Sequence, residues 1–351
     1  MTANTMLNIA KIAATYAGTI MGAGFASGQE LTQFFVVYGN MGLAGLLVTG
    51  FLFCWLGMQI LEISYKTQAT SYHEVLYYVC GKRIGLLLDI MTTLFLFGVL
   101  TIMLAGAGTI CYNTFKLPYS LGLAIMAFSL IITTLYGLKG ITTANIIVTP
   151  LLIITIIIIG LSSLSHHQLS LAIIDLPPQT TDLPAPHWLI ASLLYLSYNL
   201  VMSTTVLAPL GSCIVQRPAR ILGSLTGGLI LILVAGLLTI VVMIHYPESL
   251  DHEIPMLYIT NVQHPLYHGA YIFIFTAAIY TTGLACLYGC AAKLTATTRL
   301  STKFSLLVLV ILSLIFSRVG FADLIGIIFP IFGYIALWFT CRLLYLSFFP
   351  K

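Results

Sequence analysis

Long apolar stretches separated by short polar breaks run through the whole chain of 351 residues. A helix that spans a membrane needs about 20 consecutive apolar residues, and most of these stretches reach that length. Strands of a membrane β-barrel would instead alternate polar and apolar residues over about 10 positions. The pattern therefore predicts an all-α membrane protein with ten transmembrane helices. The predicted spans cover residues 8–37, 42–65, 84–113, 119–137, 142–164, 188–212, 221–246, 266–297, 304–317 and 321–346.

Composition indicates that the chain lies in a lipid bilayer. Hydrophobic residues make up 59% of it and charged residues only 7%, whereas a soluble domain has about 25% charged residues. The formal net charge of +4 is small and dispersed, so no nucleic-acid partner is expected. No catalytic set of residues is recognisable, and we expect no enzymatic activity. The pattern carries no signal for an oligomeric state.

The lysines and arginines predict how the chain crosses the bilayer. If the N-terminus is cytoplasmic, twelve of the 14 lie on the inner side and only Lys116 and Arg318 lie outside. Cytoplasmic loops of membrane proteins carry such an excess. We therefore expect a multi-pass protein of the cell's inner (plasma) membrane with both termini in the cytoplasm.

A polar connection over residues 165–187 divides the predicted spans into two groups of five. An odd number of spans in each half makes the halves lie in opposite orientations, which is typical of an inverted-repeat transporter. We predict a first five-helix repeat over 1–164, an extracellular loop over 165–187 and a second, inverted five-helix repeat over 188–351.

The first predicted span carries four glycines between Gly18 and Gly28. Each glycine disfavours a continuous helix by about 1 kcal/mol relative to alanine. A break here would free carbonyl groups around Gly18–Met21, which favour a cation, and N–H groups around Gly22–Phe25, which favour an anion. The alternative is that the glycines permit close helix packing of the GxxxG type.

The sixth span opens the second half as the first span opens the first half. It contains an unusual polar run, with Ser197, Tyr198, Asn199, Ser203 and Thr204 in mid-membrane. Interrupted spans at corresponding positions of two halves indicate a transporter binding site, so a second break is predicted. The alternative is that the hydroxyl groups bond back to carbonyls of their own helix.

The eighth span contains two adjacent hydroxyl groups, Thr281 and Thr282. With the carbonyl of Ala278 one turn earlier, they offer three oxygens to a hard cation. Ordinary helix hydroxyls are the alternative interpretation.

The stretch Gly18–Glu30, with its core Gly-Ala-Gly-Phe-Ala-Ser-Gly-Gln-Glu, resembles the first span of the YkvI-like family of bacterial membrane proteins. That family is grouped with the amino acid–polyamine–organocation superfamily. The resemblance implies the leucine-transporter (LeuT) fold, a five-plus-five inverted repeat in which helices 1 and 6 are broken.

The resemblance also implies a sodium ion as the one bound cofactor. First-span carbonyls and eighth-span oxygens enclose the ion in sodium-coupled members of the superfamily. The corresponding residues in this chain are Gly18, Met21, Ala278, Thr281 and Thr282.

A small-molecule substrate site is implied next to the ion. Unwound N–H groups of the first span hold the substrate carboxylate in amino-acid transporters of this fold, and sixth-span side chains line the pocket. The matching residues are Gly22, Ala23 and Gly24 for the carboxylate, and Tyr198, Asn199, Met202 and Ser203 for the pocket. The implied function is sodium-coupled symport of an amino acid or similar small carboxylate by alternating access.

Two other functions stay open at this point. Glu30 and Asp323 lie nearer the ends than the centres of their spans, so an interface location is expected for them because charges are costly in mid-membrane. Either could instead couple transport to protons. A non-transporting solute sensor or receptor on the same fold is the second alternative.

Overall fold

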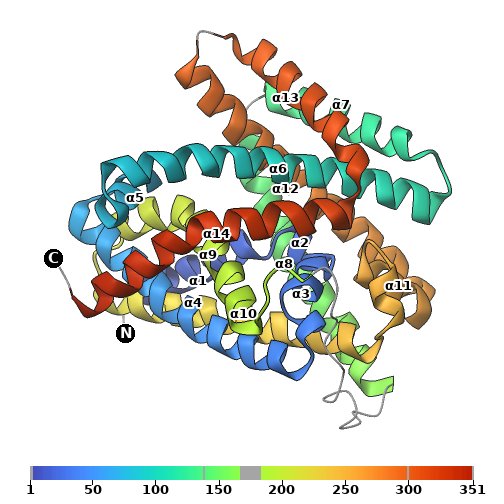
Figure 1. Ribbon diagram of the computed structural model, residues 1–351, viewed down its shortest axis with the longest axis horizontal. Helices are drawn as coiled ribbons and strands as arrows, with labels where there is room; N and C mark the ends of the chain where they lie inside the picture. Colours follow the sequence, from blue (N-terminus) through green and yellow to red (C-terminus); the bar gives the residue numbers. More distant parts are fainter. Residues whose placement is uncertain (1–2, 137–138, 167–182, 299, 350–351) are drawn as a thin grey trace.

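The computed structural model describes residues 3–136, 139–166, 183–298 and 300–349, and all regular structure in these ranges is helical. Long helices cross the molecule and shorter ones connect them (Figure 1). The elements are α1 (Ala3–Ile20), α2 (Ala23–Ala26), α3 (Gln29–Phe34), η1 (Val36–Tyr38), α4 (Asn40–Thr67), α5 (Tyr72–Cys80), α6 (Lys82–Phe115), α7 (Tyr119–Tyr136), α8 (Lys139–His166), α9 (Trp188–Cys213), α10 (Arg217–Ile244), η3 (Glu248–Asp251), α11 (Pro255–Gln263), α12 (Pro265–Thr297), α13 (Thr302–Phe316), η4 (Ser317–Val319) and α14 (Phe321–Phe348).

Seven of the described helices are long and apolar enough to cross a membrane, and two shorter apolar segments, Tyr119–Leu135 and Pro150–Ser165, accompany them. This confirms an all-helical, multi-pass membrane protein. The count of ten spans stays a prediction. The first predicted span is divided into α1, α2 and α3, and none of the three is among the seven helices.

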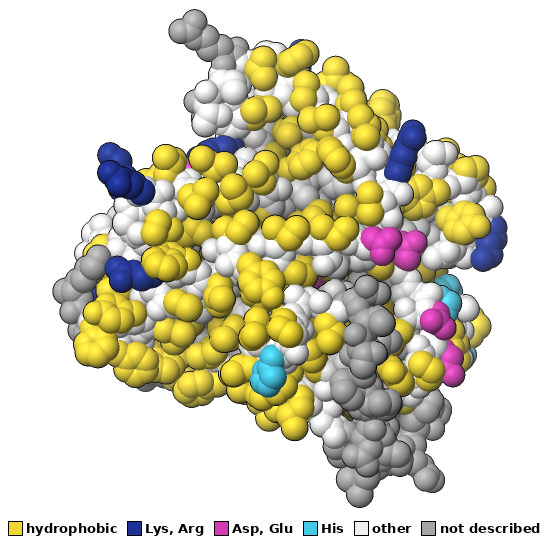
Figure 2. Space-filling view, in the orientation of Figure 1, with side chains coloured by type: hydrophobic (Ala, Val, Ile, Leu, Met, Phe, Trp, Pro, Cys, Tyr) yellow, Lys and Arg dark blue, Asp and Glu magenta, His cyan; other side chains and the backbone are white. Residues whose placement is uncertain are grey.

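The outer surface is as apolar as a bilayer requires. Hydrophobic side chains cover most of the face in Figure 2, and the few charged side chains lie toward its edges. Leu47, Phe51, Phe128 and Phe273 are examples of large side chains that are more than half exposed. In water such a surface would aggregate, whereas lipid tails cover it without cost.

Two groups of helices meet around the first helix break. The first group is α1, α4, α9 and α10, which pack against one another; the second is α6, α7, α8, α12 and α13, and α14 lies along both α6 and α9 (Figure 1). Close packing within the first group depends on small residues. A Cβ atom on Gly228 of α10 would come within 2.5 Å of the Cys54 sulfur of α4.

The predicted break in the sixth span is wrong, because α9 runs without interruption from Trp188 to Cys213. Its polar side chains bond to carbonyls one turn earlier in the same helix. Asn199 Nδ2 donates to Tyr195 at 3.0 Å and Ser203 Oγ donates to Asn199 at 2.6 Å. These local bonds satisfy the polar groups inside lipid, and Gly211 is the only glycine in the helix. The alternative interpretation of this run was the correct one.

The predicted division into two repeats depends on the connection 165–187. Residues 167–182 of that connection lie outside the described residues.

Candidate substrate and ion site

The break in the first span lies at Met21 and Gly22, between α1 and α2. The Gly22 N–H donates to the carbonyl of Ile20 at 2.8 Å, whereas a continuous helix would direct it to Gly18. Gly22 itself is extended, with ψ of −173°. The Gly18 carbonyl therefore loses its usual donor, as the glycine-rich sequence predicts.

The α2 helix begins at Ala23, and its first intrahelical bond runs from Ala26 N–H to the Gly22 carbonyl at 3.0 Å. The first N–H groups of a helix have no partner one turn earlier. Ala23 and Gly24 are in this position, but Gly22 is not, because Ile20 takes its N–H. The resemblance implies three N–H groups for a carboxylate. Those of Ala23 and Gly24 have no partner one turn earlier, and that of Gly22 is already bonded.

Helix α12 lies against the break. The hydroxyl of Thr282 is 3.8 Å from the position that a Cβ atom on Gly22 would occupy. Nearer the start of α12, Tyr271 Oη donates to the Ala26 carbonyl of α2 at 3.0 Å. The Tyr271 bond joins α12 to α2.

The other oxygens of the implied sodium site come from the same two segments. Thr281 is buried, and its hydroxyl donates to the Ala278 carbonyl at 3.2 Å. A carbonyl oxygen and a hydroxyl oxygen each keep a lone pair after such a bond. Neutral carbonyl and hydroxyl oxygens are ligands that a hard cation accepts, and a sodium site at Gly18, Met21, Ala278, Thr281 and Thr282 stays a prediction.

A buried carboxylate lies on the other side of α2. Glu30 of α3 is only 6% exposed, and its Oε2 accepts a hydrogen bond of 2.9 Å from Tyr198 Oη of α9. Its Oε1 would be 2.1 Å from a Cβ atom on Gly24. Gly24 thus makes room for the carboxyl group directly after the break, and Glu30 is buried inside the protein whatever its depth in the bilayer.

Tyr198 is the predicted pocket residue that the tertiary structure brings to the break. Its ring packs against Phe34 of α3 at 5.7 Å and against Phe329 of α14 at 5.0 Å. Asn199 and Ser203 are buried and bond within α9, and Met202 is half-buried on the same helix. Sequence analysis missed the Glu30–Tyr198 pair, although Glu30 closes the glycine-rich motif that carries the resemblance.

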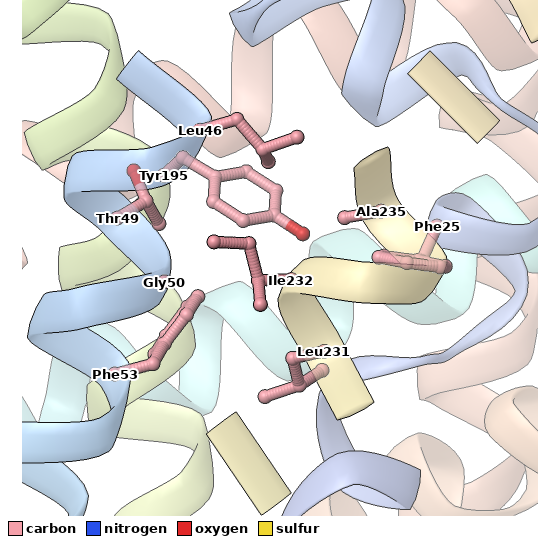
Figure 3. Close-up of a pocket in the computed structure, with 9 residues that line it drawn as sticks. All are labelled: Phe25, Leu46, Thr49, Gly50, Phe53, Tyr195, Leu231, Ile232 and Ala235. Carbon is pink, nitrogen blue, oxygen red and sulfur yellow. The ribbon is translucent and has the colours of Figure 1, made fainter. Parts of the chain in front are cut away.

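A small cavity reaches Phe25 of α2. It measures about 10 Å³ and is lined mainly by apolar side chains of α4, α9 and α10 together with Phe25 of α2. Figure 3 shows the ring of Tyr195 between Leu46 and Ile232 in this cavity. A space of this size holds at most one water molecule.

The segment that follows α2 is covered by α11. The Met256 N–H donates to the Ser27 carbonyl at 3.1 Å, and Ser27 Oγ donates to the Gly24 carbonyl at 2.6 Å. Just before α11, Glu253 Oε2 accepts from Thr109 Oγ1 of α6 at 2.9 Å and from the Phe321 N–H of α14 at 3.0 Å. These bonds attach the segment before α11 to both α6 and α14.

Two ion pairs hold the end of the molecule where the inner loops are predicted. Asp89 of α6 is buried and pairs with Lys293 of α12, and it also accepts from Tyr72 Oη of α5 at 2.7 Å. Arg220 of α10 pairs with Glu62 of α4 at 3.0 Å. Each of these interior acids has a basic partner.

The chain is similar over nearly its whole length to two proteins of Bacillus subtilis (strain 168). It is 31% identical to the membrane protein YkvI over 337 residues, which is 95% of this chain and 94% of YkvI. It is 29% identical to the protein YyaD over 342 residues, which is 93% of this chain and 94% of YyaD. No protein-family model matches the chain.

Solved structures of transporters share the fold. Mhp1 in its inward-facing conformation matches with a TM-score of 0.66 at 17% identity, covering 94% of this chain and 73% of Mhp1. MhsT in complex with L-phenylalanine matches with 0.64 at 16% identity, covering 93% and 87%. A Na⁺-coupled sialic acid symporter matches with 0.63 at 14% identity, covering 97% and 79%.

At such low identity these structures establish the fold alone, which is the LeuT fold. The expectation drawn from Gly18–Glu30 is confirmed by the whole-length similarity to YkvI. The chain belongs to the YkvI family of membrane proteins.

Proposed function

We propose that the protein is a secondary active transporter that carries a small solute by alternating access, with sodium as a coupling ion. One observation carries this proposal: the first span is broken at Gly22, and the Thr282 hydroxyl of α12 faces the break. Helix breaks at membrane depth expose backbone groups that only a ligand, water or neighbouring protein can satisfy. The Na⁺-coupled sialic acid symporter has the same fold, which also favours sodium.

The cargo is an amino acid or a similar small carboxylate. The Ala23 and Gly24 N–H groups support it, because both start α2 without a partner one turn earlier. The sodium ion would bind at the carbonyl end of the same break. Ion and solute then bind cooperatively, since one ligand orders the backbone that the other needs.

The transporter crosses the membrane ten times as two inverted five-helix repeats, 1–164 and 188–351, with both termini in the cytoplasm. Two features support this arrangement. The chain ends lie at the same side of the molecule in Figure 1, which an even number of crossings requires. The lysines and arginines are distributed as the positive-inside rule expects.

A thermal-shift screen of the purified protein tests the proposal. Amino acids and other small carboxylates are added with and without sodium, and a solute that stabilises the protein more strongly in sodium is then tested for uptake into proteoliposomes. Thr282→Val keeps the shape of the side chain and removes the oxygen. We expect this variant to lose the sodium dependence, whereas Thr226→Val, at an exposed position of α10, should retain it.

Three outcomes would contradict parts of the proposal. If no carboxylate stabilises the protein in sodium, the cargo is wrong. If T282V keeps full sodium dependence, the ion site is wrong. Binding without uptake into proteoliposomes would favour the receptor function instead.

A further inference from the structure

Glu30 differs from the other acidic side chains in the interior. Glu62 pairs with Arg220 and Asp89 pairs with Lys293. Glu30 is 6% exposed, and among the residues that the structure describes no lysine, arginine or histidine pairs with it. Its polar side-chain partner is the hydroxyl of Tyr198.

The surroundings of Glu30 are aromatic and uncharged. Tyr195 and Tyr198 of α9 are the titratable groups that face it. From α14, Phe329 packs on Tyr198, and from α2, Gly24 lies against the carboxyl group. Within the described chain, α10 and α12 bring no charged partner to this carboxyl group.

An ionised carboxylate in such an environment is costly unless a positive charge accompanies it. An organic ammonium would need space, and the cavity lined by the neighbouring Tyr195 measures only about 10 Å³. A proton needs none. The close approach of the carboxyl group to Gly24 leaves no room for a larger ion between them.

We propose that Glu30 is a proton-binding site of the transport cycle. The carboxyl group carries its proton in the closed arrangement described above. When the helices separate and water reaches the break, the carboxyl O–H bond breaks, the proton passes to water and Glu30 becomes a carboxylate. Rebinding of a proton precedes closure.

The position of Glu30 links this proton to the solute, a step that rests on the proposed function. The solute carboxylate is proposed to bind beside Gly24, and an ionised Glu30 at the same residue would repel it. Protonation removes the repulsion, so proton and solute favour each other's binding. By linkage, solute affinity should then fall by about tenfold per pH unit wherever free Glu30 is ionised.

Infrared pH-difference spectroscopy on the purified full-length protein tests the proton site without any solute. The wild type should show the carbonyl stretch of a protonated carboxyl group that disappears as the pH rises between about 4 and 10. This band should be absent in Glu30→Gln and present in Glu74→Gln, because Glu74 is exposed on α5. In Tyr198→Phe the band should remain at a shifted frequency, since one hydrogen bond is lost. A wild-type spectrum identical to that of E30Q would overturn the proposal.

Solute binding as a function of pH separates this inference from the proposed function. With a carboxylate from the thermal-shift screen, wild-type affinity should weaken at rising pH and E30Q affinity should stay constant. A carboxylate that binds the wild type without pH dependence refutes the link to Glu30 and leaves the transporter proposal intact. A Glu30 band without any carboxylate ligand refutes the proposed cargo and leaves the proton site intact.

Discussion

Tyr198 and Glu30 are joined by a hydrogen bond of 2.9 Å between side chains that are 168 positions apart in the chain. The bond connects α3, which follows the helix break, to the uninterrupted α9. Both side chains are buried, so water does not replace the bond when it is lost. The pair therefore fixes α3, the part of the first span that follows the break, against the continuous helix α9.

Replacing Tyr198 by Phe should destabilise the protein, because it leaves the Glu30 carboxyl group without its hydroxyl partner. Because Glu30 is proposed to be protonated in this arrangement, the bond joins two neutral groups and should contribute about 0.5–1.5 kcal/mol. The midpoint of thermal unfolding in detergent is the measurement. Tyr112→Phe is the matched control, since Tyr112 is 61% exposed on α6. Equal midpoints for Y198F and Y112F would show that the bond contributes nothing to stability.

Replacing Gly24 by Ala should displace the Glu30 side chain. The added Cβ atom would lie 2.1 Å from Oε1, and overpacking of this kind costs about 1–3 kcal/mol. The same thermal measurement detects the loss, with Gly269→Ala as control because nothing lies within 4 Å of that position. Adding Glu30→Ala to Gly24→Ala should recover part of the stability. A double variant no more stable than G24A would contradict the clash with Glu30.

Removing the base from the inner ion pair should destabilise the protein strongly. Lys293→Met removes one of two basic groups beside the buried Asp89, the other being His73 at 3.1 Å, and breaking a buried pair costs about 3–5 kcal/mol. Because the Lys293 side chain is 28% exposed, we expect the lower part of that range. The free energy of unfolding of K293M, Asp89→Asn and the double variant forms the measurement. If the two single losses simply add, the residues do not interact.

Tyr72 supports this pair over a wide pH range. Burial, and then the hydrogen bond to Asp89, raise the pKa of Tyr72 well above its ordinary value. The neutral hydroxyl therefore remains the donor at every physiological pH. The contribution of this bond should be lost only in strongly alkaline solution. The difference in unfolding midpoint between the wild type and Tyr72→Phe should accordingly be constant from neutral to mildly alkaline pH.

Replacing Glu253 by Ala should loosen the start of α14. Glu253 accepts from the Phe321 N–H, and loss of a helix cap costs about 0.5–2 kcal/mol. Hydrogen–deuterium exchange of the segment 320–324 should become faster than in the wild type. Glu248→Ala, at an exposed position nearby, should leave the exchange unchanged. Unchanged exchange in E253A would show that the carboxylate does not stabilise this helix end.

Several features could be predicted without coordinates. Long apolar stretches identify membrane helices. Lipid offers no hydrogen-bond partners, so each backbone N–H and C=O group must be hydrogen-bonded within its own segment. The glycines from Gly18 to Gly28 predict the first break because they weaken the helix locally, whatever surrounds it. The family assignment could be predicted for a similar reason, since the motif Gly18–Glu30 is contiguous in the chain.

The sequence does not decide whether the sixth span is broken, because its polar residues have two ways to be hydrogen-bonded. Asn199 and Ser203 can form hydrogen bonds across a helix break or to carbonyls of their own helix. The amino-acid sequence is compatible with both arrangements. Only the coordinates show that the bonds are local.

The amino-acid sequence alone determined that the chain is a helical membrane protein of the YkvI type with a weak point at Gly22, because these properties depend on neighbouring residues. The tertiary structure decided that α9 is continuous and that Glu30 is buried against Gly24 and Tyr198. The physical reason is that Glu30 and Tyr198 are 168 positions apart in the chain and meet only after folding. Whether a charge is buried or exposed depends on helices that pack against it from far away in the sequence.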